Sequence, residues 1–232
     1  MSTDERSDRL IANRLKAGLT DTVIIGREII VREQTGSTND AILQFAFPQG
    51  AAVSSLPAVA SAKEDPPPLV DEGLVVFAEH QTDGRGQRGN RWESAAGKGL
   101  WFSILLRPEI QLSDSGRLTI WAIEAVSDVI RTTFGLQPAI KLPNDVQLYG
   151  RKVSGVLVEM RAQEKAPHLA VVGIGINVNQ CRDDFPAELQ DRAISLAIAS
   201  GRHVDRQSFA VALLRNLDLT YREKFPHSSS AS

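Results

Sequence analysis

Residues 74–106 read LVVFAEHQTDGRGQRGNRWESAAGKGLWFSILL, which is two apolar runs joined by a segment rich in glycine and arginine. The runs, Leu74–Ala78 and Leu100–Leu106, predict two strands, and the segment between them predicts a loop. Glycine lets a backbone approach a ligand closely, and arginine adds fork-shaped cationic donors suited to phosphate or carboxylate. The stretch therefore favours a loop that closes over an anionic ligand, with a mobile surface loop as the alternative.

The spacing Gly84-x-Gly86-x-x-Gly89 also matches the dinucleotide-binding fingerprint, but its context is wrong. That fingerprint must open a helix whose N-terminus holds a pyrophosphate. The residues that follow it include Trp92 and two more glycines, show no 3.6-residue apolar period, and run into a strand. The HRD and DFG motifs of protein kinases are absent, as is a Walker A lysine-serine pair. We therefore expect none of these three nucleotide sites.

Composition limits the classes of protein that fit. The 232 residues, 42% of them hydrophobic, are enough to bury the core of one large domain. A formal net charge of −2 argues against a bulk nucleic-acid binder. Cys181 is the only cysteine, which excludes an intramolecular disulfide and a cysteine-rich zinc site. The charged N-terminus lacks a signal-peptide core and no apolar stretch is long enough to span a membrane, so we expect a cytoplasmic protein.

Helix and strand patterns follow one another along the chain without regular alternation. Ser37 or Thr38 is expected to cap a helix that runs to about Phe47, and Ser113 or Asp114 is expected to begin another. The predicted helices cover residues 4–17, 38–47, 113–134 and 208–225, and further strands cover 29–31, 146–148, 153–160 and 169–178. A tight hairpin turn is predicted at 149–152. Strands in meander order with grouped helices predict an α+β fold with a mixed, largely antiparallel sheet backed by helices.

We expect one domain over residues 1–232, with an N-terminal extension at 1–27 and a frayed tail at 226–232. Residues 48–72 contain five prolines among many alanines and serines. This composition predicts a flexible surface insertion.

Four segments together resemble the catalytic domain of biotin protein ligases, from about residue 28 to 223. Each motif alone is weak, whereas the four in this order and spacing are specific. They are Gly36–Asn39, the loop Gly84–Trp92 with Gln81 before it, Lys141–Asp145 followed by Arg151–Glu159, and Gly173–Asn179. The resemblance implies the class II synthetase-like fold of biotin and lipoate ligases.

The resemblance implies a ligase that works in two steps. Biotin attacks the α-phosphate of ATP, with Mg²⁺ present, to give biotinyl-5′-AMP and pyrophosphate, and a carrier lysine then attacks the adenylate. Such chemistry needs fixed cationic and N–H donors more than a nucleophile of the enzyme's own. By resemblance, Lys152 touches the biotin carboxylate and the α-phosphate, while Arg85 and Arg88 add charge from the loop. The alternative for Lys152 is a solvated lysine in a basic hairpin turn.

Neutral polar residues are expected around the rest of the ligand. Ser37, Thr38, Asn39 and Gln81 match family positions that hold the biotin ring and ureido group, which neutral donors and acceptors suit. A helix cap is the alternative role of Ser37–Asn39. The other positions that the resemblance assigns to biotin or nucleotide are Gly84, Gly86, Gln87, Gly89, Trp92, Lys141, Asn144, Gly155, Gly175 and Asn177.

Several of these residues keep two interpretations. Trp92 either stacks on the ligand or anchors the loop. Asn177 lies near the adenine and ribose by resemblance, and the glycines before it otherwise mark a kinked strand. Asp145 orients or deprotonates the carrier lysine, helps to hold Mg²⁺, or forms a turn after proline. His80 has no visible metal partners, so we expect it to pack or form a hydrogen bond, and we expect no protein metal site.

The chain departs from the family pattern within its motifs and at its ends. Gln87 and Asn90 stand where many members carry basic residues, which weakens the expected grip on the adenylate, and Leu142 replaces a frequent tryptophan. Because few residues precede the first strand, we do not expect the helix-turn-helix domain of members that repress transcription. A C-terminal β-barrel is expected to be absent or very reduced.

The family implies a biotin carboxyl carrier protein of acetyl-CoA carboxylase as partner, and neither nucleic acid nor membrane. Exposed sheet edges permit a homodimer. A lipoate-type ligase remains an alternative, which the Gly-Arg-Gly-x-Arg-Gly signature disfavours. Another is a non-catalytic module that senses biotin or nucleotide, which Gln87 suggests.

Overall fold

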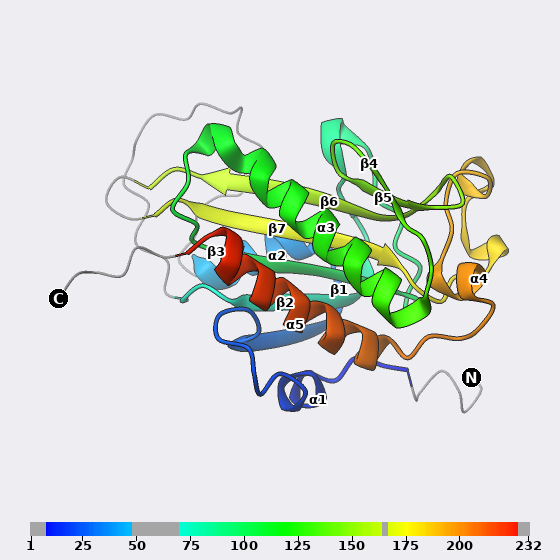
Figure 1. The fold of residues 1–232 in the computed structure, drawn as a ribbon, viewed down its shortest axis with the longest axis horizontal. Helices are drawn as coiled ribbons and strands as arrows, with labels where there is room; N and C mark the ends of the chain where they lie inside the picture. The colour runs from blue at the N-terminus through cyan, green and yellow to red at the C-terminus, as the bar shows by residue number, and fades with distance from the viewer. Residues whose placement is uncertain (1–7, 48–69, 164–166, 227–232) are drawn as a thin grey trace.

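The computed structural model describes residues 8–47, 70–163 and 167–226. Within them, seven strands form one sheet in the order β1-β2-β3-β7-β6-β5-β4 (Figure 1). Among these strands β1 and β2 pair in parallel, and every other neighbouring pair is antiparallel, so the predicted sheet type is confirmed. The strands are β1 Glu28–Thr35, β2 Leu74–Gln81, β3 Gly99–Leu106, β4 Ala139–Lys141, β5 Asp145–Leu148, β6 Arg151–Arg161 and β7 Leu169–Asn177.

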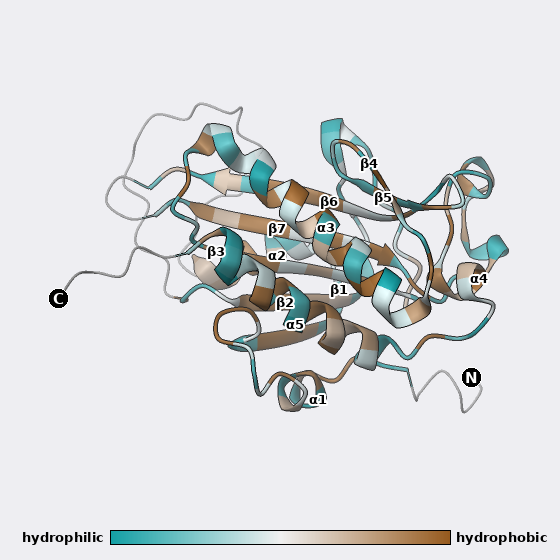
Figure 2. Cartoon of the chain, viewed as in Figure 1, coloured by the Kyte–Doolittle hydropathy of each residue, from teal (hydrophilic) through white to brown (hydrophobic). Residues whose placement is uncertain are grey.

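Helices cover both faces of the sheet, with α2 on one face and α3 and α5 side by side on the other (Figure 1). The helices are α1 Ala12–Ala17, α2 Thr38–Ala46, α3 Ser115–Phe134, α4 Leu196–Ser200 and α5 Arg206–Lys224. Apolar residues concentrate on the central strands beneath the two long helices (Figure 2). The main core lies there, and a second, smaller cluster lies under α2.

The two faces of the central strands differ in the size of their side chains. Successive residues of a strand point to opposite faces. Toward α3 and α5, strands β3 and β7 contribute large apolar residues such as Phe102 and Ile174 to the main core. On the opposite face Leu105 and Val171 pack under α2, and Ser103, Gly173 and Gly175 are the small residues beyond them. Because α2 covers only part of that face, these small residues leave a hollow beside its N-terminus.

The N-terminal segment packs into the core. Its helix α1 begins at Ala12 and not at residue 4 as predicted. Five apolar residues of the segment are buried in the main core: Leu10, Leu15, Leu19, Ile24 and Ile25. The buried carboxylate of Asp218 in α5 accepts the backbone N–H groups of residues 23–25 at 2.7 to 3.1 Å. The structure does not describe residues 1–7, 48–69, 164–166 and 227–232, where the start of the predicted extension, most of the predicted insertion and the tail fall.

The two long helices start close to their predicted positions, with different caps. α3 begins at Ser115 after a 3₁₀ turn, and its N-cap residue Asp114 makes no side-chain capping bond. α5 begins two residues before the predicted Ser208. Asp205 caps it, because its Oδ1 accepts a hydrogen bond from the Ser208 amide at 2.7 Å.

The predicted hairpin turn between β5 and β6 is confirmed. Tyr149 and Gly150 form the turn, and their φ angles of 52° and 73° are both left-handed, as a type I′ turn requires. The turn sets Lys152 beside β5 and pairs Gly155 with Asp145.

Candidate active site

A pocket occupies the hollow beside the N-terminus of α2. It encloses about 430 Å³ of atom-free space, part of it open to solvent. All four sequence motifs contribute to it. The predicted residues that line it are Ser37, Thr38, Asn39, Gln81, Arg85, Gly86, Trp92, Asn144, Lys152, Gly155 and Gly175. We call residues 82–98, which connect β2 to β3 across this pocket, the glycine-arginine loop.

The side chain of Gln81, and not that of the N-cap residue, satisfies a backbone N–H group at the start of α2. Ser37 is the N-cap residue, one of the two positions predicted, but its side chain makes no capping hydrogen bond. The Thr38 N–H, an orphan donor of the first turn, instead donates to Gln81 Oε1 at 2.8 Å. Gln81 Nε2 in turn donates to Ser94 Oγ at 3.1 Å. Gln81 therefore ties β2, α2 and the glycine-arginine loop together at the pocket.

Ser103 and Glu159, to which no role was assigned from the sequence, fix the amide of Asn39. Asn39 Oδ1 accepts a hydrogen bond from Ser103 Oγ at 2.5 Å, and its Nδ2 donates to Glu159 Oε2 at 2.6 Å. Ser103 Oγ also lies 2.8 Å from Thr38 Oγ1. Because the two partners of Asn39 differ in character, they define which way its amide points. This side of the pocket presents neutral donors and acceptors in fixed positions.

Arg85 is held between two carboxylates. Its Nη2 lies 2.8 Å from Asp40 Oδ1 and 3.1 Å from Glu159 Oε2. Burial raises the pKa of Asp40 above its ordinary value, the Arg85 guanidinium opposes that shift, and the carboxylates of Glu159 and Asp83 add to it. The positive charge of Arg85 at the pocket is therefore balanced by Asp40 and Glu159. The sequence patterns did not indicate this pairing.

Asp40→Asn should raise the free energy of unfolding at neutral pH and leave it unchanged well below pH 3.8, the ordinary pKa of this side chain. A raised pKa means that the native state binds the proton more tightly than the unfolded chain does. Native stability is therefore lost as the pH rises above 3.8 through the raised pKa, and asparagine escapes this loss. Denaturant unfolding of both proteins on either side of this range checks the sign. A variant less stable than wild type at neutral pH would show that the Arg85 ion pair outweighs desolvation.

Lys152 places a cation on the other side of the pocket. Its Nζ lies 2.6 Å from Asp145 Oδ1 and 5.1 Å from the ring centroid of Trp92. The strand that carries it is held from the outside as well, because Lys152 N donates to Arg192 O and Lys152 O accepts from Ile194 N. Lys152 is thus a paired side chain in the pocket wall, unlike a free hairpin lysine.

Two glycines form the floor under Trp92. Gly155 and Gly175 are direct partners in the ladder between β6 and β7. A Cβ at Gly175 would lie 2.6 Å from Trp92 Cε2, and one at Gly155 would lie 2.9 Å from Lys152 Nζ and from Trp92 Cζ3. Trp92 also packs edge-on against Trp101, with ring centroids 5.9 Å apart. The indole therefore both anchors the loop and lines the pocket.

Seven predicted site residues do not line the pocket. Asp145 reaches it through its ion pair with Lys152. Gly84 packs behind it, where a Cβ would lie 2.5 Å from Trp92 O. Asn177 is buried and donates to Ile194 O at 3.2 Å, so it ties the end of β7 to a neighbouring loop. The other four are exposed or half-buried on the loop or on β4: Gln87, Arg88, Gly89 and Lys141.

In the part of the chain that the structure describes, His, Cys, Asp and Glu form no group of three or more that could hold a metal ion. His80 Nδ1 lies 3.5 Å from Gln34 Oε1, and Cys181 is exposed beside Asp184. None of the helices described is long and apolar enough to cross a membrane.

Known proteins share this sequence and fold. A model of the biotin/lipoate A/B protein ligase family matches residues 53–177, more than half of the chain. The chain belongs to the biotin/lipoate A/B protein ligase family. The fold class expected from the sequence motifs is therefore confirmed.

Individual members of the biotin/lipoate A/B protein ligase family align over most of the chain. The bifunctional ligase/repressor BirA of Bacillus spizizenii is 44% identical over 156 residues, which are 67% of this chain and 48% of that protein. The biotin–[acetyl-CoA-carboxylase] ligase of Mycobacterium tuberculosis is 33% identical over 196 residues, 83% of this chain and 63% of that protein. The chain thus spans about half to two thirds of the length of these curated relatives.

A solved structure in the biotin/lipoate A/B protein ligase family supports the same fold. The biotin protein ligase from Aquifex aeolicus in complex with biotin and ATP superposes with a TM-score of 0.67 at 29% identity. The superposition covers 87% of this chain and 73% of that one.

Proposed function

We propose that this protein is an ATP-dependent ligase that activates biotin as biotinyl-5′-AMP and transfers it to a lysine of a biotin carboxyl carrier protein. The observation that carries the proposal is the division of one pocket into a neutral side around Asn39 and Gln81 and a cationic side at Lys152. A ureido ring suits the first side, and a carboxylate beside a phosphate suits the second. The names of the relatives and the Aquifex complex with biotin and ATP support this substrate pair.

In the first step, a carboxylate oxygen of biotin attacks the α-phosphorus of ATP. The bond from that phosphorus to the oxygen that bridges the α- and β-phosphates breaks, and pyrophosphate leaves with its electron pair. Negative charge is concentrated where carboxylate and α-phosphate meet, and the Lys152 ammonium, held by Asp145 and Trp92, is placed to stabilise it. Arg85 adds a second charge when the anionic ligand competes with its two carboxylate partners.

In the second step, the amine of a carrier lysine attacks the carbonyl carbon of the mixed anhydride. AMP leaves, and the new amide nitrogen loses a proton. We assign Asp145 to accept that proton, because its carboxylate lies 2.6 Å from Lys152 Nζ and its side chain remains 21% exposed to an incoming group.

Mg²⁺ would arrive with the nucleotide, since magnesium commonly binds substrate phosphates with one or two carboxylates. The described residues build no metal cage, and no step above depends on one.

The proposal includes a carrier protein of acetyl-CoA carboxylase as partner, which the name of the Mycobacterium relative supports. We place the reaction in the cytoplasm, without nucleic acid or membrane as partner. The described sheet ends in β1 and β4, and either edge would serve a homodimer.

A lipoate-type acyl-adenylate ligase is the second candidate, because the matching family includes lipoate ligases. The fixed polar groups around Asn39 favour biotin over lipoate. A ureido group can form further hydrogen bonds with these polar groups, whereas a dithiolane ring cannot, so the neutral side of the pocket discriminates between the two ligands.

The test of the function is to incubate the pure protein with ATP, Mg²⁺, biotin and a carrier domain. We expect mass spectrometry to find one biotin on one carrier lysine, and none when ATP is left out. Lipoate in place of biotin is the matched control. Tight binding of biotin without any modified carrier would point to a sensing module.

Gln87→Arg should slow the release of biotinyl-AMP by about two- to fivefold, as a surface ion pair of up to about 1 kcal/mol would do. Gln87 is half-buried on the glycine-arginine loop, and arginine there adds a cation to the segment that covers the adenylate. Retention of radiolabelled adenylate through gel filtration measures the rate, with Gln87→Met as the uncharged control. Equal or faster release from the arginine variant would contradict this role of the loop.

A further inference from the structure

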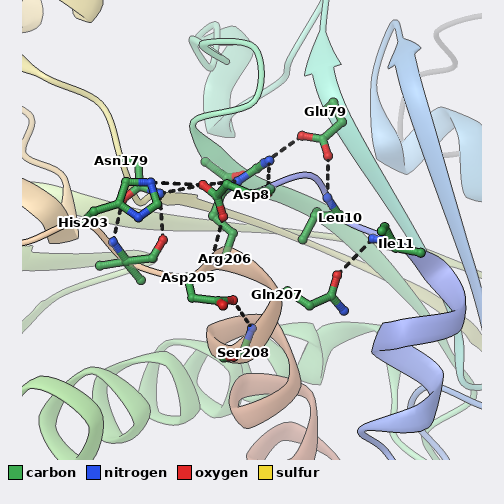
Figure 3. A network of polar contacts seen from close by, with 12 residues as sticks. Asp8, Leu10, Ile11, Glu79, Asn179, His203, Asp205, Arg206, Gln207 and Ser208 are labelled. Carbon is green, nitrogen blue, oxygen red and sulfur yellow. Dashed lines mark hydrogen bonds and ion pairs between the residues drawn. The ribbon is translucent and has the colours of Figure 1, made fainter. Parts of the chain in front are cut away.

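Arg206 joins several distant parts of the chain in a buried network outside the pocket (Figure 3). Its side chain is only 2% exposed. Nη1 donates to Glu79 Oε2 at 2.7 Å and to Gly99 O at 3.0 Å. Nη2 donates to Asp8 O at 2.7 Å, and the backbone N and Nε donate to the Asp8 carboxylate at 3.0 and 3.2 Å. The fork of one guanidinium therefore links α5, the N-terminal segment, β2 and β3.

Two of these partners lie at the base of the glycine-arginine loop. The backbone ladder between β2 and β3 ends at the pair Ala78 and Trp101. Beyond that pair one backbone hydrogen bond remains, from Gly97 N–H to Glu79 O at 3.0 Å. Arg206 Nη1 adds a side-chain link at the same place, between the Glu79 carboxylate and Gly99 O. Glu79 lies near the end of β2, where the loop leaves the sheet, and Gly99 lies at the start of β3, where the loop returns. Both accept hydrogen bonds from the same nitrogen atom of Arg206.

The N-terminal segment completes this network. Leu10 N–H donates to the second oxygen of Glu79 at 2.8 Å, so the segment also holds the carboxylate that Arg206 binds. Asn179 Nδ2 donates to Asp8 Oδ2 at 2.9 Å and fixes Asp8 from the other side. Asp8 and Glu79 together neutralise the buried guanidinium of Arg206. Removing either carboxylate would leave part of the guanidinium without an anionic partner.

We propose that Arg206, with Glu79 and Asp8, is a positioning clamp that holds the glycine-arginine loop over the pocket. Arg206 does not line the pocket, so it acts through the loop that carries Arg85 and Trp92. Changing the clamp changes the separation of the two loop ends, and the displacement carries to these two side chains. The consequence for adenylate retention rests on the proposed ligase function, whereas the consequence for loop opening does not.

Limited digestion with trypsin tests the clamp directly, because the loop contains the cleavage sites Arg85, Arg88, Arg91 and Lys98. The first test variant is Arg206→Lys, because a lysine ammonium cannot reach all the partners of the guanidinium at once. The second is Asp8→Asn, because the NH₂ group of asparagine would face the N–H donors of Arg206 and Asn179 that the carboxylate now accepts. Asp218→Asn is the matched control. Asp218 is 1% exposed and holds the same N-terminal segment, but its hydrogen bonds go to residues 23–25 and Arg222, none of them in the loop.

We expect both clamp variants to be cleaved within the loop at least about tenfold faster than wild type while still folded by circular dichroism. The rate of loop cleavage in Asp218→Asn should stay within about twofold of wild type, even if its melting temperature falls as much as that of the clamp variants. Release of biotinyl-AMP should rise in the same two variants. Two results would overturn the proposal. One is a rate of loop cleavage that rises with the loss of melting temperature in the same way in all three variants, and the other is an unchanged rate in the two clamp variants. If Arg206→Lys does not fold, Asp8→Asn decides, and the trypsin result holds whether or not the protein makes adenylate.

Discussion

Replacing Lys152 with alanine should lower the rate of biotinyl-adenylate formation by about 100- to 1000-fold, the usual effect of removing one preorganised donor from a transition state. Lys152 is a pocket cation fixed by a carboxylate at 2.6 Å and an indole ring at 5.1 Å. Alanine removes that charge and also leaves Asp145 as an uncompensated carboxylate near the phosphates. Pyrophosphate release with saturating substrates measures the rate. Biotin affinity, measured by calorimetry, should change much less, because the neutral contacts remain.

Arg151→Ala is the matched control for this prediction. Arg151 is the neighbour of Lys152 in the same strand and carries the same charge, but it does not line the pocket. Its removal should change turnover by no more than about twofold, as expected for a surface charge. Turnover of Lys152→Ala above about a tenth of wild type, or equal losses in the two variants, would mean that Lys152 is not the stabilising cation.

The second large effect is expected from Gly173→Ala, which should weaken biotin binding by about 100-fold, because small displacements of positioning groups cost this much. A Cβ on Gly173 would overlap Asn39 Oδ1 and press on Asn39 Cγ. Asn39 would have to leave its hydrogen bonds to Ser103 and Glu159, so the neutral side of the pocket would lose its fixed geometry. Calorimetric titration with biotin measures the effect.

Gly116→Ala is the control for an added methyl group. Gly116 lies in the first turn of α3, where nothing comes within 4 Å of an added Cβ. Alanine there should leave biotin affinity unchanged and raise stability by up to about 1 kcal/mol, because alanine suits a helix better than glycine. Near-normal biotin affinity in Gly173→Ala would show that Asn39 does not contact biotin.

The sheet and the long helices were predictable from the sequence because their patterns are local. Apolar runs marked every described strand except β4, whose three residues are all exposed, and the 3.6-residue period marked α3. The turn at Tyr149 and Gly150 followed from its residue types. Eleven of the predicted site residues meet in one pocket because each belongs to a motif with a fixed place in the chain.

Other contacts depend on residues far apart in the sequence and escaped prediction. Gln81 replaces the expected Ser37 cap over a separation of 43 residues, and Glu159 bonds Asn39 over 120. Arg206 bonds Glu79 over 127 residues. One signal was available: Ser103 is a lone polar residue within the apolar run of β3. A buried hydroxyl in such a run needs a partner, and that partner proves to be the amide of the site.

Exchange of radiolabelled pyrophosphate into ATP tests the central claim most directly, because it reports formation of the adenylate without any carrier protein. The proposed function predicts exchange that requires biotin and Mg²⁺, is lost in Lys152→Ala and persists in Arg151→Ala. Absence of biotin-dependent exchange in a preparation that binds both biotin and ATP would contradict it.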